Sequence, residues 1–294
     1  MSPEPDILST PNVPKEKQLL KSFVTGVLVL GALVVSSAQA PQGALPLDPS
    51  RERGASITPA FEGWYPNPDG SFTLLVGYYN RNSKQTLDIP VGADNKIEPG
   101  APDQGQPTFF EVGRQWGVFA IKVPKDFGNK AVTWTIVSNG DKQSIPLTLN
   151  KGYPITPFKE LGMGNAPPVL AFAEGGPKFT GPPVGTAATL TGKVGQPVTF
   201  NVWVEDPKPA QGEGGRPSST VASVSLHKFR GPGTVTFAKA RLSASKQGEM
   251  VSTTGTFSAA GEYIVRVQAN DESGEGGGGF QCCWTNAHVK VTIQ

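Results

Sequence analysis

The chain has 294 residues, which is enough for about two domains, and its formal net charge is only +2. It has no long basic run, and this excludes the electrostatic footprint of a nucleic-acid-binding protein. Its 36 glycines and 28 prolines lie between short apolar segments. That distribution indicates many turns joining short β-strands, because a disordered chain would lack the apolar segments.

Near the N-terminus, a polar stretch containing lysines precedes the uncharged run FVTGVLVLGALVV (23–35), and the small residues SSAQA follow it. This order is typical of a secretory signal peptide. The run is shorter than the ~20 residues that span a bilayer. We therefore predict a signal peptide over 1–40, cleaved near residue 38 or 40, and an exported protein, periplasmic or extracellular. An uncleaved segment, which would be the chain's one membrane contact, and a buried helix are the alternatives.

After this segment the sequence divides into a Pro-rich linker, two strand-rich regions and a connector. We predict the linker at 41–56, a first sandwich at 57–150, a connector at 151–166 and a second sandwich at 167–294. The first region has about seven strand-like runs in about one hundred residues, the pattern of an antiparallel sandwich. Six of these runs are 70–82, 85–91, 107–112, 116–123, 130–137 and 142–149. We expect 107–112 and 116–123 to form a hairpin around Gly113-Arg114-Gln115.

In the second region, strand-like segments alternate apolar and polar residues. The segments PVTFNVWVED (197–206) and EYIVRVQAND (262–271) each place alternate apolar side chains on one face. This pattern puts one face in a core and the other in water. No segment sustains a 3.6-residue period. The predicted fold class is all-β, with two antiparallel immunoglobulin-like sandwiches in tandem after the signal peptide.

One fragment of the second region carries a family resemblance. The pattern F-x-x-x-G-x-Y-x-V-x-V is formed by Phe257, Gly261, Tyr263, Val265 and Val267. Together with the terminal VKVTIQ it resembles the immunoglobulin-like PKD/cadherin-type modules of bacterial exported proteins, over roughly 167–294. The resemblance implies a fold but hardly a function. The first region is similar in texture to uncharacterised exported bacterial proteins.

The resemblance also implies a place for binding. In such a sandwich the second and sixth strands run in the same direction, so Asp206 and Asp271, which follow 197–205 and 262–270, should lie at the same pole. Two long Gly-rich loops, 207–219 and 272–283, leave from there. Because binding sites concentrate on long loops held by a rigid sandwich, we predict the working surface at this pole.

Several acidic residues gather at the same predicted pole. Asp206, Asp271 and Glu272 are candidate ligands for Ca²⁺, which takes six to eight oxygen ligands. The spacing matches no EF-hand loop, and solvated acids at strand ends are the plainer alternative. Calcium is the one metal that we consider at this pole, and the one possible cofactor that we predict. The full set of acids is Glu205, Asp206, Glu213, Asp271, Glu272 and Glu275.

The only two cysteines, Cys282 and Cys283, are adjacent. In an oxidising compartment they would form a vicinal disulfide. Buried structural thiols, and soft-metal ligation with His288, are the alternatives. A bridged pair beside Phe280 and Trp284 would make a rigid apolar plate that faces a ligand.

The first region is rich in aromatic residues. In GYYNRN, Tyr78 and Tyr79 must face opposite sides of a strand, so we expect one of them to be exposed. Exposed rings on a sandwich can stack on sugars, whereas buried rings are ordinary packing. Trp64, Tyr65, Tyr78 and Tyr79 are therefore the candidate residues for a sugar surface.

The sequence contains two histidines and no catalytic motif, so we predict a protein that is not an enzyme and has no catalytic residues. Two functions remain. The first is an exported interaction or scaffold protein that contacts a partner protein or cell-surface component through the loop pole. The second is a carbohydrate-binding accessory protein that binds a cell-surface glycan through exposed aromatic rings of the first region.

Overall fold

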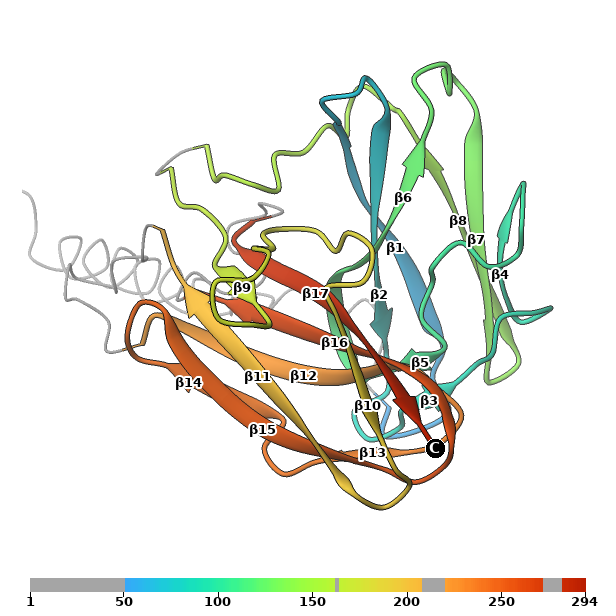
Figure 1. Cartoon of the computed structure of the whole chain (residues 1–294). Coiled ribbons are helices and arrows are strands. Elements are labelled where there is room, and N and C mark those ends of the chain that lie inside the picture. The colour runs from blue at the N-terminus through green and yellow to red at the C-terminus, as the bar shows by residue number, and fades with distance from the viewer. Residues whose placement is uncertain (1–50, 162–163, 208–219, 272–281) are drawn as a thin grey trace, which may run out of the picture. The chain divides into compact units, whose positions relative to one another are not determined.

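The computed structural model describes residues 51–161, 164–207, 220–271 and 282–294. The chain is all-β over these ranges, and residues Ser50–Gln294 form one compact unit (Figure 1). None of the described residues forms a helix that is long and apolar enough to cross a membrane. The predicted signal peptide and most of the linker lie outside the described residues.

The first sandwich consists of two three-stranded sheets with strand orders β1-β2-β6 and β4-β7-β8, and a small sheet β3-β5 beside them. All pairs within these sheets are antiparallel. Taking β1, β2, β4, β6, β7 and β8 as strands A, B, C, E, F and G gives the immunoglobulin arrangement of ABE against CFG. The strands are β1 (Ile57–Pro66), β2 (Phe72–Asn80), β3 (Leu87–Asp88), β4 (Asn95–Glu98), β5 (Phe109–Phe110), β6 (Gly113–Val123), β7 (Ala131–Ser138) and β8 (Asp141–Thr148).

The second sandwich packs a four-stranded sheet, β13-β15-β11-β9, against a five-stranded sheet, β10-β17-β16-β12-β14. Its edge strand β10 runs parallel to β17, and the other pairs are antiparallel. This arrangement also follows the immunoglobulin pattern, with β11, β12, β15, β16 and β17 as strands B, C, E, F and G. The strands are β9 (Val169–Ala171), β10 (Ala188–Gly192), β11 (Pro197–Glu205), β12 (Ala222–Arg230), β13 (Val235–Phe237), β14 (Arg241–Ala244), β15 (Glu249–Phe257), β16 (Gly261–Asn270) and β17 (Trp284–Ile293).

Each sandwich has its own hydrophobic core. The first surrounds Trp134, with Phe119 edge-on at 5.0 Å between ring centroids. The second is built from alternate residues of β11, β12, β16 and β17, such as Val202 and Val267. Strand β16 at Val265–Ala269 and strand β17 at Trp284–Ala287 are buried on both faces. There the face turned away from this core contacts the first sandwich, through Arg266 and Asn286.

One predicted hairpin is wrong. We expected 107–112 and 116–123 to pair around Gly113-Arg114-Gln115, but those three residues begin β6, which pairs with β2. The short strand β5 pairs with β3 instead. Strand β3 covers only Leu87–Asp88 of the predicted strand 85–91. Gly113 has φ +78°. A glycine adopts this angle without strain, so here it starts a strand and not a turn.

The connector is more ordered than its composition indicates. Trp64 of β1 donates its backbone N–H to Tyr153 O (3.0 Å) and accepts from Ile155 N–H (2.9 Å). The connector therefore adds a short parallel bridge to the outer edge of β1. A Cβ on Gly63 would lie 2.5 Å from Ile155 Cγ2, so the close approach requires glycine at that position.

Candidate functional site

Ends of five strands of the second sandwich, β9, β11, β12, β16 and β17, meet at one end of the domain (Figure 1). Glu205, the last residue of β11, pairs with Val169, and Asn270, the last residue of β16, pairs with both Ser223 and Trp284. The two chain segments that leave this end, 208–219 and 272–281, lie outside the described residues, as do Glu213, Glu272, Glu275 and Phe280.

The described acids at this end are engaged by other protein groups. Asp271 accepts a hydrogen bond from Asn165 Nδ2 at 2.5 Å, and Glu205 pairs with Lys178 at 2.6 Å. The backbone of Asp206 exchanges two 2.7 Å hydrogen bonds with the Gln247 side-chain amide. No group of three or more potential metal ligands occurs among the described residues. A calcium site that uses Asp206, Asp271 and Glu272 stays a prediction.

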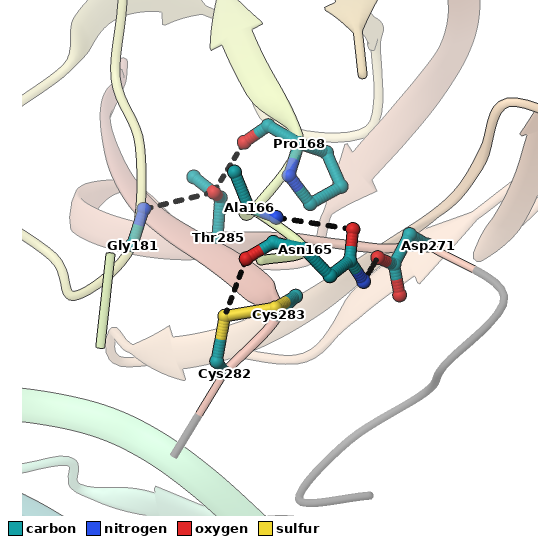
Figure 2. Close-up of a disulfide and its surroundings, with 8 residues drawn as sticks. All are labelled: Asn165, Ala166, Pro168, Gly181, Asp271, Cys282, Cys283 and Thr285. Atoms are coloured by element: carbon teal, nitrogen blue, oxygen red, sulfur yellow. Dashed lines mark hydrogen bonds between the residues drawn. A yellow bond between two sulfur atoms is a disulfide. The ribbon is translucent and has the colours of Figure 1, made fainter. Parts of the chain in front are cut away.

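The two cysteines lie just before β17 and are joined as a vicinal disulfide (Figure 2). The peptide bond between them is cis, and their Cα atoms lie 3.1 Å apart. Cys282 Sγ lies 4.0 Å from the backbone oxygen of Asn165, whose side chain holds Asp271. The disulfide therefore sits between the connector and the end of β16.

The expectation of an exposed apolar plate does not hold for these cysteines. Cys282, Cys283 and Trp284 are 3%, 1% and 1% exposed, and Phe280 is outside the described residues. Their burial has a local cause. The segment before β10 covers the start of β17, where Gly181 N–H donates to Thr285 Oγ1 at 2.9 Å and the Thr285 hydroxyl donates to Pro168 O.

The first sandwich has no row of exposed aromatic rings at the predicted positions. Tyr65 and Tyr78 are buried, and Trp64 is half-buried with its Nε1 donating to Asn150 O at 2.8 Å. Burial raises the pKa of the Tyr78 hydroxyl, which accepts a hydrogen bond from Glu111 N–H at 2.8 Å. Tyr79 is 40% exposed. As expected, the two neighbouring tyrosines face opposite sides, but three of the four candidate rings have packing roles.

The two sandwiches are joined by side chains of β17 that bind the edge of β6. The Asn286 side-chain amide donates to the carbonyl oxygens of Trp116 and Gly117, each at 3.1 Å, and His288 Nε2 lies 3.1 Å from Val118 O. Burial lowers the pKa of His288 to about 4, although the Val118 contact opposes the shift. Neutral His288 therefore donates its Nε2–H to Val118 O.

Trp284 anchors the same junction. Its indole packs directly over Gly117, where an added Cβ would lie 1.9 Å from Trp284 Cη2. Farther along the junction, Arg230 pairs with Asp103 at 2.8 Å and Lys228 pairs with Asp88 at 2.9 Å.

A buried carboxylate lies on the first sandwich's side of this junction. Glu62 accepts from Arg114 Nη2 at 2.8 Å and from Gly117 N–H at 2.7 Å. The Arg114 guanidinium stacks on Trp116, 3.8 Å from the ring centroid, and Arg266 of the second sandwich donates to Gln115. Burial raises the pKa of Glu62 to about 7, outweighing the opposing effect of Arg114.

Sequence reasoning missed Glu62, Gly117 and Arg266. Glu62 and Arg266 interrupt otherwise apolar strand segments, and a charge inside such a segment signals a buried pair. The signal identifies a polar junction, but it does not identify which strands meet there.

Fold and site together define an all-β protein of two immunoglobulin-like sandwiches joined by a buried polar and aromatic junction. No protein-family model matches the chain, and neither does any curated protein. Among solved structures, it is similar to the D00-D0 domain of intimin, with 12% identity, 81% of this chain and 100% of that chain covered, and a TM-score of 0.26. Domains 4 and 5 of the S-layer protein SbsC give 14% identity, 81% and 98% coverage, and a TM-score of 0.23. A protein of unknown function from Porphyromonas gingivalis W83 has 8% identity, with 80% of this chain and 99% of that chain covered and a TM-score of 0.22. Likenesses of this degree assign neither a family nor a function to this chain.

Proposed function

We propose that the chain is a non-catalytic exported scaffold protein that binds a partner protein or cell-surface component at the end of the second sandwich where β11 and β16 terminate. The observation that carries the proposal is the convergence of those strand ends, each of which leads into a long Gly-rich segment. A rigid sandwich holds the bases of both segments at fixed positions, which suits a binding surface built from loops.

The placement of the reactive side chains supports a binding role and not a catalytic one. His288 donates to Val118 O inside the junction, and both cysteines are bonded to each other and buried. His227 is half-buried in β12, with Nδ1 3.9 Å from Glu111. The histidines and cysteines therefore contribute to packing, to hydrogen bonding and to the disulfide. With three candidate aromatic rings packed, no observation favours the carbohydrate-binding alternative.

The test is binding of the purified, fluorescently labelled protein to intact cells of the organism that produces it, measured by flow cytometry. In one variant, 208–219 and 272–281 are each replaced by a short Gly-Ser linker. We expect at least tenfold weaker binding for this variant.

The matched control replaces the turn Lys193–Gln196, at the opposite end of β11, with the same linker. It should bind like the parent protein. Equal binding by the parent and the two-loop variant would refute the proposed surface.

A further inference from the structure

Strand β6 is an edge strand of the sheet β1-β2-β6, and only part of its outer edge is covered. The carbonyls of Trp116, Gly117 and Val118 accept from Asn286 and His288, which close the first half of the edge. Beyond Val118 the strand continues for five residues to Val123, and none of the described strands pairs with that side.

The direction of the free backbone groups follows from the pairing of β1. Trp64 directs both its N–H and its C=O outward to the connector, so its pairing with Leu74 contains no hydrogen bonds. Leu74 must then bond to Ile121 on its other side. Because hydrogen-bonding direction alternates along an antiparallel strand, Ala120 and Lys122 point their N–H and C=O groups away from the sheet.

A pocket of about 420 Å³ lies beside this free edge. Its lining includes Tyr65, Thr73 and Lys122, which are aligned across the three strands by the register. Pro183, Val184 and Gly185 also line it, and Val184 is 72% exposed. A depression beside an open sheet edge can take the alternate side chains of an added strand.

The usual protection of such an edge is weak here. Lysine on an edge strand normally discourages pairing with another chain. The ammonium of Lys122 is instead held 2.6 Å from Asp69, in the turn between β1 and β2. Asp69 and Lys122 are the charged residues that line the pocket, and they neutralise each other. The pocket is therefore better suited to an uncharged segment than to a charged one.

We propose that the edge of β6 at Ala120 and Lys122 is a docking site for an extended, uncharged peptide segment of a partner protein. The segment adds as a strand beside β6 and seats one apolar side chain in the pocket between Tyr65 and Val184. The choice of partner rests on continuity with the junction. The second sandwich covers this edge through side chains only. Among the described residues no strand pairs with the backbone donors and acceptors beyond Val118, so they can bond to another backbone. This site is independent of the loop surface proposed above.

The test is amide hydrogen exchange by NMR on the full chain, with a capped pentapeptide of alternating threonine and valine at millimolar concentration. In the free protein we expect the amides of Ala120 and Lys122 to exchange at least a hundredfold faster than those of Phe119 and Ile121. Added peptide should slow the exchange of Ala120 and Lys122 at least tenfold.

Two controls isolate backbone pairing. The same peptide with N-methylated alternate residues cannot donate and should give no protection. Ala120→Pro removes one outward N–H and no bond to β2, a position at which edge strands tolerate proline, and should abolish binding. The variant Tyr79→Ser, on the same sheet but away from the pocket, should bind like the parent.

Four outcomes would overturn the proposal. Equal protection by the N-methylated peptide, or none by either peptide, would show that the edge takes no added strand. Protection of Ala120 and Lys122 in the free monomer would make a segment of this chain the occupant, and protection that grows with protein concentration would make it a second copy.

Discussion

At the scale of single residues, the junction depends on two groups whose protonation states burial shifts in opposite directions. Glu62 tends to keep its proton near neutrality and His288 tends to stay unprotonated in mild acid. Between about pH 4.5 and 7, Glu62 therefore binds a proton in the native chain but not in the unfolded chain. Between about pH 4 and 6.5, His288 binds a proton in the unfolded chain but not in the native chain. The two contributions to stability oppose each other between about pH 4.5 and 6.5.

Glu62→Gln tests the first contribution. Native Glu62 titrates near pH 7 and the unfolded side chain near 4.5, so the native state binds more protons between these values and stability falls as the pH rises through them. Glutamine resembles the protonated form at every pH. We expect nearly equal stability for the variant and the parent at pH 4, below the pKa of the unfolded side chain, and a variant more stable by up to about 3 kcal/mol at pH 8. Urea unfolding at both pH values measures this. A less stable variant at pH 8 would mean that the Arg114 ion pair outweighs burial.

His288→Gln tests the second. Native His288 titrates near pH 4 and the unfolded side chain near 6.5, so stability present above pH 6.5 is lost as the pH falls toward 4. The His288→Gln variant should lack this loss of stability. The Glu62→Gln variant should lose stability more steeply than the parent as the pH falls, because the opposing contribution of Glu62 is then absent. Urea midpoints between pH 4.5 and 7 separate the three curves. Parallel curves for all three proteins would contradict the assignment of both groups.

Substitution of Gly117 should perturb the junction strongly. It has φ +51° and lies under the Trp284 indole, so alanine there adds both backbone strain and a clash. We expect Gly117→Ala to cost about 3 kcal/mol of unfolding free energy. The matched control is Gly140→Ala, which has φ +81° and open space around its Cβ, and should cost only about 1 kcal/mol. Similar losses for the two variants would show that Trp284 relaxes away.

At the scale of elements, the turn before β16 shows how a sequence motif becomes a contact. Tyr263 packs against Phe257, with ring centroids 4.8 Å apart, and its hydroxyl donates to Ala259 O at 2.8 Å and accepts from Gly233 N–H at 3.0 Å. The hydroxyl thus ties two loops at one end of the second sandwich, as the tyrosine corner does in immunoglobulin-like folds.

Tyr263→Phe removes both hydrogen bonds and keeps the ring. We expect a loss of about 2 kcal/mol, since the partners Ala259 O and Gly233 N–H lose their bond to the hydroxyl. Tyr79→Phe removes a hydroxyl from a more exposed ring and should change stability by less than about 0.5 kcal/mol. Thermal unfolding followed by circular dichroism compares the two. Indistinguishable melting temperatures for the two variants would show that the Tyr263 hydroxyl does not stabilise the fold.

The success of the sequence predictions differs between elements for physical reasons. Strands with strict alternation, such as β11 and β16, were predicted because one face is apolar. The hairpin at 107–123 was wrong because glycine at 113 starts a strand as readily as a turn. Alternation placed Tyr78 and Tyr79 on opposite faces, but it does not reveal that the connector and second sandwich cover much of the outer face, where Tyr65 and Leu75 are buried. The convergence of β11 and β16 followed from the strand directions that the family resemblance implies. The junction could not be predicted in this way, because the sequence does not show which faces of the two sandwiches meet.

At the scale of the whole molecule, the junction makes the two sandwiches depend on each other. Phe229 and Ile264 of the second sandwich pack against the core of the first, and Thr108 N–H bonds to Phe229 O at 3.1 Å. Unfolding one sandwich would therefore expose apolar surface on the other.

We expect a single calorimetric unfolding transition for the parent protein. Trp284→Ala leaves a cavity over Gly117 and should split this transition in two, because each core then unfolds at its own temperature. Trp203→Ala, on the face of β11 away from this junction, should lower the melting temperature without splitting the peak. A single peak in the Trp284 variant would show that the remaining contacts couple the sandwiches by themselves.

The one disulfide joins neighbours in the chain, and this has a consequence for where the protein can fold. A crosslink between adjacent residues leaves the conformational freedom of the unfolded polypeptide almost unchanged, in contrast to a bridge that closes a long loop. Both β-sandwiches are thus held together by packing, hydrogen bonds and ion pairs, and no disulfide joins distant parts of the chain. The body of this protein should form as readily among cytosolic reductants as outside the cell, with only the geometry around residue 282 left to respond to the redox state.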